Sequence, residues 1–268
     1  MKLAVLGSPI SHSKSPALHG HWLAENNIQG TYEAIEIKPE NLEHDFGKLL
    51  EAGYEGFNVT VPLKEKIGVF CDFFDGGAQA TGAVNTIHLK DHKLYAYNTD
   101  IYGFQRNIEI NAPTFNWSDG PAVILGAGGA ARAAAYVLRQ NNAPEIRIVN
   151  RTALKGVNLA EDFGGHFMEW EDREKALKGA NILINATSLG MQGGKPLNIN
   201  LENLPERALV TDIVYTPLMT PLLTQALERG NTVVTGADMF FYQAQKSFEI
   251  WTGLSPRVDD SSKEAIAK

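Results

Sequence analysis

A lysine and several polar side chains lie where one apolar segment of the sequence ends. Within residues 56–64, Asn58 and Thr60 alternate with apolar residues, so a strand would place both on one side. Lys64 follows the break at Pro62, near the carboxyl end of that strand. A lysine ammonium can stabilise negative charge that grows on a substrate oxygen and can deliver a proton to it. The segment therefore predicts acid–base chemistry, with Lys64 as the proton donor.

Asp100 is the second candidate for this chemistry, and its side chain has two interpretations. It follows Asn98 and Thr99 and precedes a predicted helix. As a carboxylate it can orient the Lys64 ammonium, and as the residue before a helix it can cap the free N–H groups of the first turn. The residue types alone leave both interpretations open.

Two serines, Ser13 and Ser15, precede the first predicted helix, two positions apart in the chain. Both hydroxyls can face one anionic group beside the helix N-terminus, where free N–H groups and the helix dipole favour negative charge. Ser15 is also expected to be the N-cap, with Pro16 at the first helical position. The loop therefore predicts a site for a substrate anion such as a carboxylate.

A glycine-rich turn between an apolar run and an alanine-rich segment predicts a nucleotide site. Gly126 and Gly128 allow a tight turn and close approach of the backbone to a pyrophosphate, and Ala131 fills the third place of the fingerprint. The next strand ends in Arg151, with Lys155 one turn further on, rather than in the acid that NAD-preferring enzymes usually carry. These cations can pair with a 2′-phosphate, which favours NADP over NAD.

The elements that must position these residues alternate between short apolar runs and segments of helical period. Strands are expected at 3–6, 32–37, 57–61, 122–126, 146–150, 166–168, 182–186, 209–214 and 232–236, with a hairpin over 84–89 and 94–97. Helices are expected at about 16–26, 39–50, 100–110 and 238–251 and between the later strands. This alternation predicts an α/β protein with parallel sheets.

Composition limits the other classes of function. The 268 residues carry a net charge of −7, which argues against nucleic-acid binding because phosphate contacts need an excess of basic side chains. No apolar run approaches the ~18 residues of a membrane span. Cys71 is the only cysteine, which fits the cytoplasm, and the histidines form no metal-type cluster. Residues 111–120 are polar, turn-rich and without periodicity, which makes them the best candidate for a domain boundary.

The chain resembles the shikimate dehydrogenase family over essentially its full length. The matching motifs are Ser-Lys-Ser-Pro at 13–16, Asn-Val-Thr-Val-Pro-Leu-Lys at 58–64, Gly-Ala-Val-Asn-Thr at 82–86, Tyr-Asn-Thr-Asp at 97–100, Gly-Ala-Gly-Gly-Ala at 126–130, Asn-Arg-Thr at 150–152, Asn-Ala-Thr-Ser-Leu-Gly-Met at 185–191, Asp-Ile-Val-Tyr-Thr-Pro-Leu-Met-Thr-Pro-Leu at 212–222, and Gln243.

The resemblance implies a role for each matching residue. Lys64 and Asp100 would be the catalytic pair. The substrate would be bound by Ser13, Ser15, Asn58, Thr60, Asn85, Tyr215 and Gln243. NADP(H) would be bound by Gly126, Ala127, Gly128, Gly129, Ala130, Asn150, Arg151, Thr152, Lys155, Thr187, Ile213, Gly236 and Met239.

The resemblance also implies an architecture and an activity. We expect a substrate-binding domain of residues 1–101 plus 238–268 and a Rossmann-type NADP-binding domain of 102–237, with a cleft between them. The implied reaction is the reversible, NADPH-dependent reduction of 3-dehydroshikimate to shikimate in chorismate and aromatic amino-acid biosynthesis, without a metal. A homodimer is compatible with this interpretation. The alternatives are a quinate/shikimate dehydrogenase with relaxed cofactor use and a non-catalytic, NADP-binding metabolite sensor.

Overall fold

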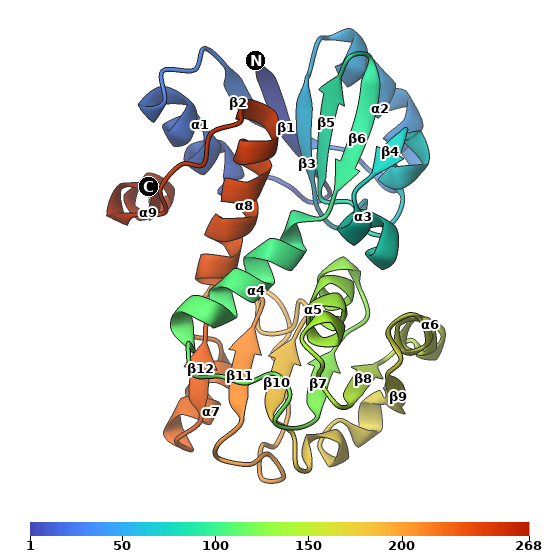
Figure 1. The fold of residues 1–268 in the computed structure, drawn as a ribbon, viewed down its shortest axis with the longest axis vertical. Coiled ribbons are helices and arrows are strands. Elements are labelled where there is room, and N and C mark those ends of the chain that lie inside the picture. Colours follow the sequence, from blue (N-terminus) through green and yellow to red (C-terminus); the bar gives the residue numbers. More distant parts are fainter. Residues whose placement is uncertain (268) are drawn as a thin grey trace. The chain divides into compact units, whose positions relative to one another are not determined.

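The computed structural model describes residues 1–267 and divides the chain into two compact units (Figure 1). The first unit combines Met1–Tyr102 with the chain from Phe241 onward, and the second is Gly103–Phe240. Both boundaries lie inside helices, one in α4 (Thr99–Asn111) and one in α8 (Ala237–Thr252). Each unit has its own sheet and its own apolar core.

The first unit is built on a mixed sheet with the strand order β2-β1-β3-β5-β6-β4. Its strands are β1 (Lys2–Gly7), β2 (Thr31–Glu36), β3 (Gly56–Val59), β4 (Phe73–Phe74), β5 (Thr86–Lys90) and β6 (Lys93–Tyr97). The strand β5 runs antiparallel to both β3 and β6, and the other pairs are parallel. The hairpin β5–β6 therefore places the carboxyl end of β6 at the same sheet edge as the carboxyl end of β3.

Helices cover both faces of this first sheet. They are α1 (Ser15–Glu25), α2 (Leu42–Glu51), α3 (Gly76–Thr81), the later part of α8, and α9 (Asp260–Ala267), with short 3₁₀ turns at Pro39–Asn41 and Ile67–Phe70. Phe46 of α2 packs with Phe57 and Val59 in the main core cluster. Since side chains alternate along a strand, Asn58 of β3 points to the opposite face, where Ser247 of α8 contacts it.

The second unit is a fully parallel sheet with the strand order β12-β11-β10-β7-β8-β9. Its strands are β7 (Ala122–Leu125), β8 (Ile146–Asn150), β9 (His166–Glu169), β10 (Ile182–Asn185), β11 (Leu209–Asp212) and β12 (Thr232–Val234). Counted from β7, this is the order 3-2-1-4-5-6 of dinucleotide-binding sheets, in which ligands bind where the order reverses, beside the first strand.

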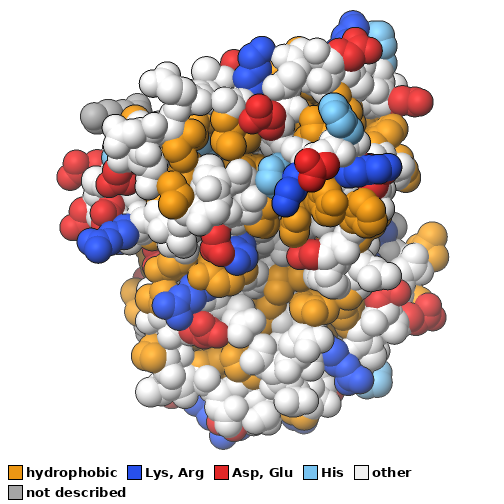
Figure 2. All heavy atoms as spheres, turned by 45° about the horizontal axis from the view of Figure 1, so that its top comes forward, with side chains coloured by type: hydrophobic (Ala, Val, Ile, Leu, Met, Phe, Trp, Pro, Cys, Tyr) orange, Lys and Arg blue, Asp and Glu red, His pale blue; other side chains and the backbone are white. Residues whose placement is uncertain are grey.

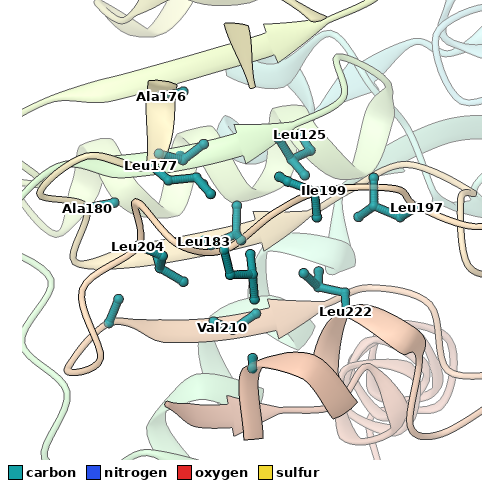
Figure 3. Packing of buried hydrophobic residues seen from close by; sticks show 14 of the residues in the cluster. Leu125, Ala176, Leu177, Ala180, Leu183, Leu197, Ile199, Leu204, Val210 and Leu222 are labelled. Atoms are coloured by element: carbon teal, nitrogen blue, oxygen red, sulfur yellow. The ribbon is translucent and has the colours of Figure 1, made fainter. Parts of the chain in front are cut away.

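The helices of the second unit lie before, between and after its strands in the sequence. They are α5 (Gly129–Gln140), α6 (Ala153–Phe163), α7 (Pro221–Glu228) and the adjoining parts of α4 and α8, with 3₁₀ turns at Trp170–Asp172 and Lys175–Leu177. Branched aliphatic side chains fill one side of the sheet: Leu125, Leu183 and Val210 from the strands meet Leu177, Leu197 and Leu222 from the connections (Figure 3). Strands buried on both faces explain the near-continuous apolar runs in the sequence.

The structure differs from the sequence expectations at several places. Residues 111–120 do not form the boundary between the units, because they lie within the second unit. The unit boundaries at 102/103 and 240/241 fall one and three residues from the expected ones. The expected strand at 57–61 ends at Val59, the helix expected at 39–50 begins as a 3₁₀ turn, and α3, β4 and α9 were not predicted.

Ser15 is not the N-cap that the sequence suggested. The helix α1 begins at Ser15, and its N-cap is Lys14, which makes no side-chain capping hydrogen bond. The hydroxyl of Ser13 accepts a hydrogen bond from the backbone N–H of Ser15 instead, at 3.3 Å. The first-turn N–H of Ser15 is therefore satisfied by the serine two positions earlier.

Two further properties concern the described part of the chain as a whole. Among residues 1–267, no helix is long and apolar enough to cross a membrane. Acidic and basic side chains are interspersed with apolar ones on the face drawn in Figure 2, and the basic ones are not gathered into a single patch there.

Candidate functional site

The sheet topology of the first unit brings three polar side chains to one edge. Lys64 lies shortly after the carboxyl end of β3, and Asp100 follows the carboxyl end of β6. Asn85 directly precedes β5, whose amino end lies at the same edge because this strand is antiparallel to both neighbours. Residues that are up to 36 positions apart in the chain thus meet at one place.

Lys64 and Asp100 form a short, largely buried ion pair. The distance from Lys64 Nζ to Asp100 Oδ2 is 2.5 Å, and the two side chains are 16% and 6% exposed. Asp100 lies within the first turn of α4, and Asn98 Oδ1 accepts a hydrogen bond from its backbone N–H. Its carboxylate contacts Lys64 and Asn85, so it does not act as the helix cap that the sequence left open.

Asn85 holds the second oxygen of this carboxylate. Its Nδ2 donates to Asp100 Oδ1 at 3.0 Å and to Thr99 Oγ1 at 2.9 Å, and Gln243 Oε1 lies 3.4 Å away. Its Oδ1 accepts from the backbone N–H of Thr99 at 2.7 Å. Both oxygens of Asp100 are therefore engaged, and its orientation toward Lys64 is fixed.

Asn58 lies behind this group and is used mainly by the protein itself. Its Nδ2 is within 3.1 Å of the Asn85 carbonyl, the Thr86 hydroxyl and the Ser247 hydroxyl. The Tyr32 hydroxyl donates to Asn58 Oδ1 at 2.7 Å. These partners hold the Asn58 amide in one orientation at the side of β3 that faces α8.

Ser13, Ser15 and Thr60 come from the segments that follow β1 and β3. Ser13 is half-buried, and the Ser15 side chain is buried at the start of α1. The backbone N–H of Thr60 donates to the Leu6 carbonyl at 2.8 Å, so this residue stays beside β1 although it lies beyond the end of β3. These hydroxyls are positioned by parallel strands of the same sheet.

The glycine-rich loop of the second unit runs from the end of β7 into α5. Gly126 has φ +109°, a conformation that side-chain-bearing residues rarely adopt, and an added Cβ would lie 3.0 Å from the Ala186 carbonyl oxygen. Gly128 is the N-cap of α5 and caps it with no side chain. The first turn of α5, with Gly129 and Ala130, therefore presents N–H groups that can donate hydrogen bonds to an anion.

The turn after β8 carries exposed cations. Arg151, Thr152 and Lys155 are exposed, and within residues 1–267 neither cation takes part in an ion pair. The side chain of Asn150 donates to the Thr152 carbonyl at 2.9 Å and shapes the turn. Free guanidinium and ammonium groups beside a nucleotide-type loop suit a phosphate ester.

The loops after β10, β11 and β12 hold the remaining candidates in contact with one another. Thr187 donates its hydroxyl to Asn185 Oδ1 at 2.7 Å, and its methyl group borders Gly126. A Cβ on Gly236 would lie 2.5 Å from the Ile213 carbonyl oxygen, so only glycine fits there. Met239 is buried in the first turns of α8.

A buried carboxylate joins two of these loops. Asp212 accepts hydrogen bonds from Asn185 Nδ2 at 2.9 Å, the backbone N–H of Val214 at 3.0 Å and the Thr220 hydroxyl at 2.7 Å. Burial raises the pKa of the Asp212 carboxyl, and these hydrogen bonds act against that rise. The carboxylate thus fixes the segment that carries Ile213 and Tyr215 to the segment that carries Thr187.

Tyr215 is the one predicted substrate residue that belongs to the second unit. Its ring stacks on Phe240, with centroids 5.0 Å apart. Burial raises the pKa of its phenol above the usual value, so the hydroxyl stays protonated at neutral pH.

Three protein-family models match successive parts of this chain. The model described as "Shikimate dehydrogenase substrate binding domain" matches residues 5–87, "Shikimate / quinate 5-dehydrogenase" matches 109–192, and "Shikimate 5'-dehydrogenase C-terminal domain" matches 236–260. A shikimate dehydrogenase (NADP(+)) from Paracoccus denitrificans is 43% identical over 265 residues, which cover 98% of this chain and 94% of the relative. The chain belongs to the shikimate dehydrogenase family.

Solved structures of this family have the same fold. A shikimate 5-dehydrogenase from Thermus thermophilus, in complex with NADP(H) and shikimate, has a TM-score of 0.86 and 36% identity over 100% of this chain and 98% of its own. A quinate dehydrogenase from Corynebacterium glutamicum in complex with NAD has a TM-score of 0.90, with 26% identity and the same coverage. The shikimate dehydrogenase fold thus accommodates different substrates and cofactors, and individual residues must decide between them.

Four residues of the network were not singled out by sequence reasoning: Tyr32, Thr86, Thr99 and Ser247. Thr86 and Thr99 lie within motifs shared with the shikimate dehydrogenase family, next to predicted site residues. Ser247 lies four positions after Gln243, which on a helix is the same face. For Tyr32 the sequence holds no local signal, because its contact with Asn58 depends on the order of the strands.

Proposed function

We propose that this protein catalyses the NADPH-dependent reduction of 3-dehydroshikimate to shikimate, a step of chorismate and aromatic amino-acid biosynthesis. The observation that carries the proposal is the buried Lys64–Asp100 pair in a chain 43% identical to an NADP(+)-dependent shikimate dehydrogenase. The first unit is assigned to the substrate and the second to the cofactor. The substrate residues of the first unit are Ser13, Ser15, Asn58, Thr60, Asn85 and Gln243. Tyr215 of the second unit is assigned to the substrate as well.

The residues of the second unit fit NADP(H). Gly126 and Gly128 leave the backbone bare where the pyrophosphate would approach, and α5 begins there with free N–H groups. Arg151 and Lys155 would hold the 2′-phosphate, and Ala127, Asn150 and Thr152 would line the adenosine side. Thr187, Ile213, Gly236 and Met239 would border the nicotinamide, which supplies the hydride when the cofactor is bound.

Lys64 supplies the proton in this reaction. As the carbonyl carbon of the substrate is reduced, negative charge develops on the carbonyl oxygen, and a positioned ammonium stabilises that charge and protonates the oxygen. The Asp100 carboxylate keeps Lys64 Nζ in place, and Asn85 keeps the carboxylate in place. After turnover Lys64 regains its proton from water, and in the oxidative direction the same groups act in reverse.

A quinate/shikimate dehydrogenase with relaxed cofactor use is the second candidate, because a quinate dehydrogenase with bound NAD has the same fold. Arg151 at the end of β8, where an acid would suit NAD, supports NADP. A non-catalytic NADP-binding metabolite sensor would not need the Lys64–Asp100 pair. We further propose that the protein works in the cytoplasm, as a monomer or a homodimer.

One assay separates these functions: initial rates with shikimate and with quinate, each with NADP⁺ and with NAD⁺. We expect the highest kcat/KM for shikimate with NADP⁺. Comparable rates with quinate and NAD⁺ would show that the protein is a quinate/shikimate dehydrogenase with relaxed cofactor use. If none of the four pairs is turned over, the non-catalytic metabolite sensor is the remaining function.

A further inference from the structure

Ser247 occupies the centre of a buried hydroxyl cluster behind the predicted substrate residues. It lies in α8 and is 0% exposed. Its Oγ lies 2.8 Å from Thr86 Oγ1, 2.9 Å from Asn58 Nδ2, 3.0 Å from the Gln243 carbonyl and 3.1 Å from Thr99 Oγ1. None of the family roles assigned above falls on this serine.

The donors and acceptors around Ser247 determine the direction of most hydrogen bonds in the cluster. The Gln243 carbonyl can only accept, so Ser247 donates its single hydrogen there and accepts from the other groups. Asn58 Nδ2 can only donate and uses one lone pair of Ser247. The second lone pair is left for a threonine hydroxyl, and the shorter distance favours Thr86.

These hydrogen-bond directions also determine which groups donate to Asn85. The hydroxyls of Thr86 and Thr99 lie 3.1 Å and 3.2 Å from Asn85 Oδ1. Since Thr86 donates its only hydrogen to Ser247, the hydroxyl that donates to Asn85 Oδ1 is that of Thr99. The same oxygen also accepts from the Thr99 backbone N–H. The amide oxygen of Asn85 is therefore held on the inner side of the site, and its N–H₂ is turned toward Asp100.

We infer that Ser247 is a positioning residue for the proposed reaction. Its hydroxyl fixes which groups donate and which accept in the hydrogen-bond network of Asn58 and Asn85, and this network orients Asp100. The inference rests on the proposed function, since it assigns the network to the binding of the ring hydroxyls of shikimate. Ser247 itself touches no substrate. It acts on Asn85 through Thr86 and Thr99. Without the Ser247 hydroxyl, the Thr86 hydroxyl would donate to Asn85 Oδ1 instead and compete there with Thr99.

A purely structural serine would give a different outcome. A hydroxyl that donates to the carbonyl four residues earlier is common in helices and contributes little to helix stability. Replacing such a serine by alanine would leave the affinity for shikimate unchanged. Replacing a positioning serine would weaken shikimate binding and leave the cofactor site alone.

The test is steady-state kinetics of shikimate oxidation by Ser247→Ala in the full chain, with thermal unfolding measured in parallel. We expect KM for shikimate to rise about tenfold, which corresponds to the loss of one or two hydrogen bonds, with KM for NADP⁺ within about twofold. The matched control is Thr252→Ala, because Thr252 donates to the Phe248 carbonyl in the same helix but lies outside the cluster. It should leave both KM values unchanged.

A double-mutant cycle shows whether Ser247 acts through Asn85. In an Asn85→Ala background, Ser247→Ala should change KM for shikimate less than about twofold. An unchanged KM for shikimate in Ser247→Ala, an equal rise for NADP⁺, or additive effects with Asn85→Ala would each overturn the inference. If Ser247→Ala does not fold, Ser247→Cys, which keeps the side-chain volume but bonds weakly, should show the same rise. A wild-type chain without turnover would instead overturn the proposed function and this inference together.

Discussion

The Lys64–Asp100 pair combines features that favour proton transfer over structural support. Exposed ion pairs contribute little because water screens them, whereas this pair is largely withdrawn from water. A withdrawn pair is costly unless its remaining polar atoms are satisfied, and Asn85 satisfies the second carboxylate oxygen. The Lys64 ammonium has two further N–H groups, which can donate hydrogen bonds to a substrate oxygen.

Removal of the Lys64 amine tests its role directly. Lys64→Ala should lower kcat by about 10²- to 10⁴-fold, the range usual for the loss of a general acid, with a smaller change in KM for shikimate. The matched control is Lys66→Ala, which removes an exposed amine two residues away. Near-normal turnover of a folded Lys64→Ala variant would remove this residue from the chemistry.

Reversal of the charge at Arg151 tests the choice of cofactor. Arg151→Asp places a carboxylate where the 2′-phosphate of NADPH would lie, so KM for NADPH should rise about 10- to 100-fold while KM for NADH changes little. Arg207→Asp, which reverses an exposed charge elsewhere in the second unit, is the control. An equal rise in KM for NADPH and NADH would mean that Arg151 does not bind the 2′-phosphate.

At the scale of the elements, the loop between β7 and α5 contains glycines that serve different purposes. Gly126 is required by the fold, because its φ of +109° and the nearby Ala186 carbonyl exclude a side chain. Gly128 has open space around an added Cβ and an extended backbone that alanine can adopt. Its lack of a side chain therefore serves a ligand rather than the fold.

Two alanine substitutions separate these purposes. Gly126→Ala should destabilise the protein by about 1–3 kcal/mol through backbone strain. Gly128→Ala should change the free energy of unfolding by less than about 1 kcal/mol yet raise KM for NADPH at least about tenfold. Urea unfolding and NADPH titration of the two variants measure these quantities. A Gly128→Ala variant with normal cofactor affinity would contradict the pyrophosphate assignment.

The sequence predicted the long periodic elements well and the short ones poorly. The segment 146–150 is rich in β-branched residues (Ile146, Ile148 and Val149), and the structure has a strand with the same bounds there. The short helix α3 was missed because Gly76 and Gly77 weaken its helix propensity. Its ends carry recognisable signals nonetheless, since Asp75 caps the first turn and Gly82 ends the helix with φ +60°.

The candidate site was only partly predictable, for a topological reason. Lys64 stood out because a cation after a polar-alternating strand has few structural uses. The contact of Asp100 with Lys64 could not be read from spacing, because it depends on β5 running antiparallel between β3 and β6. Ser247 could not be tied to Asn58 without the packing of α8 on the first sheet.

For the molecule as a whole, the first unit is assembled from both ends of the chain. Gln243, Ser247 and Trp251 follow the entire second unit in sequence, yet they hydrogen-bond to residues 58–99. The predicted substrate site is therefore complete only when the C-terminal part of the chain has packed against the first sheet. Contacts of such long sequence separation slow folding.

A buried histidine lies in the layer where these distant segments meet. His19 of α1 is 0% exposed and stacks on Tyr32 of β2 at 4.3 Å, with Trp22, Phe248 and Trp251 around it. Burial lowers the pKa of His19 to about 3. Among the described residues, its two ring nitrogens are buried without a hydrogen-bond partner. The imidazole is thus neutral in the folded protein and would be protonated below its ordinary pKa in the unfolded chain.

This difference couples the stability of the first unit to pH. Between the unfolded pKa of about 6.5 and the folded pKa of about 3, the unfolded state binds more protons, so stability is full above pH 6.5 and falls with acidification. From pH 7 to pH 5 the loss is about 2 kcal/mol, or roughly 4–8 °C in Tm. His19→Phe keeps a ring in the stack and should remove the His19 part of this loss, leaving that of His88, whose pKa is also lowered by burial. His44→Phe, at an exposed site, should retain the full loss. Scanning calorimetry at pH 7, 6 and 5 measures how Tm depends on pH in the wild type and in the two variants. The window lies above the pH at which most carboxylates titrate, so an unchanged slope in His19→Phe would mean that another group senses the acid.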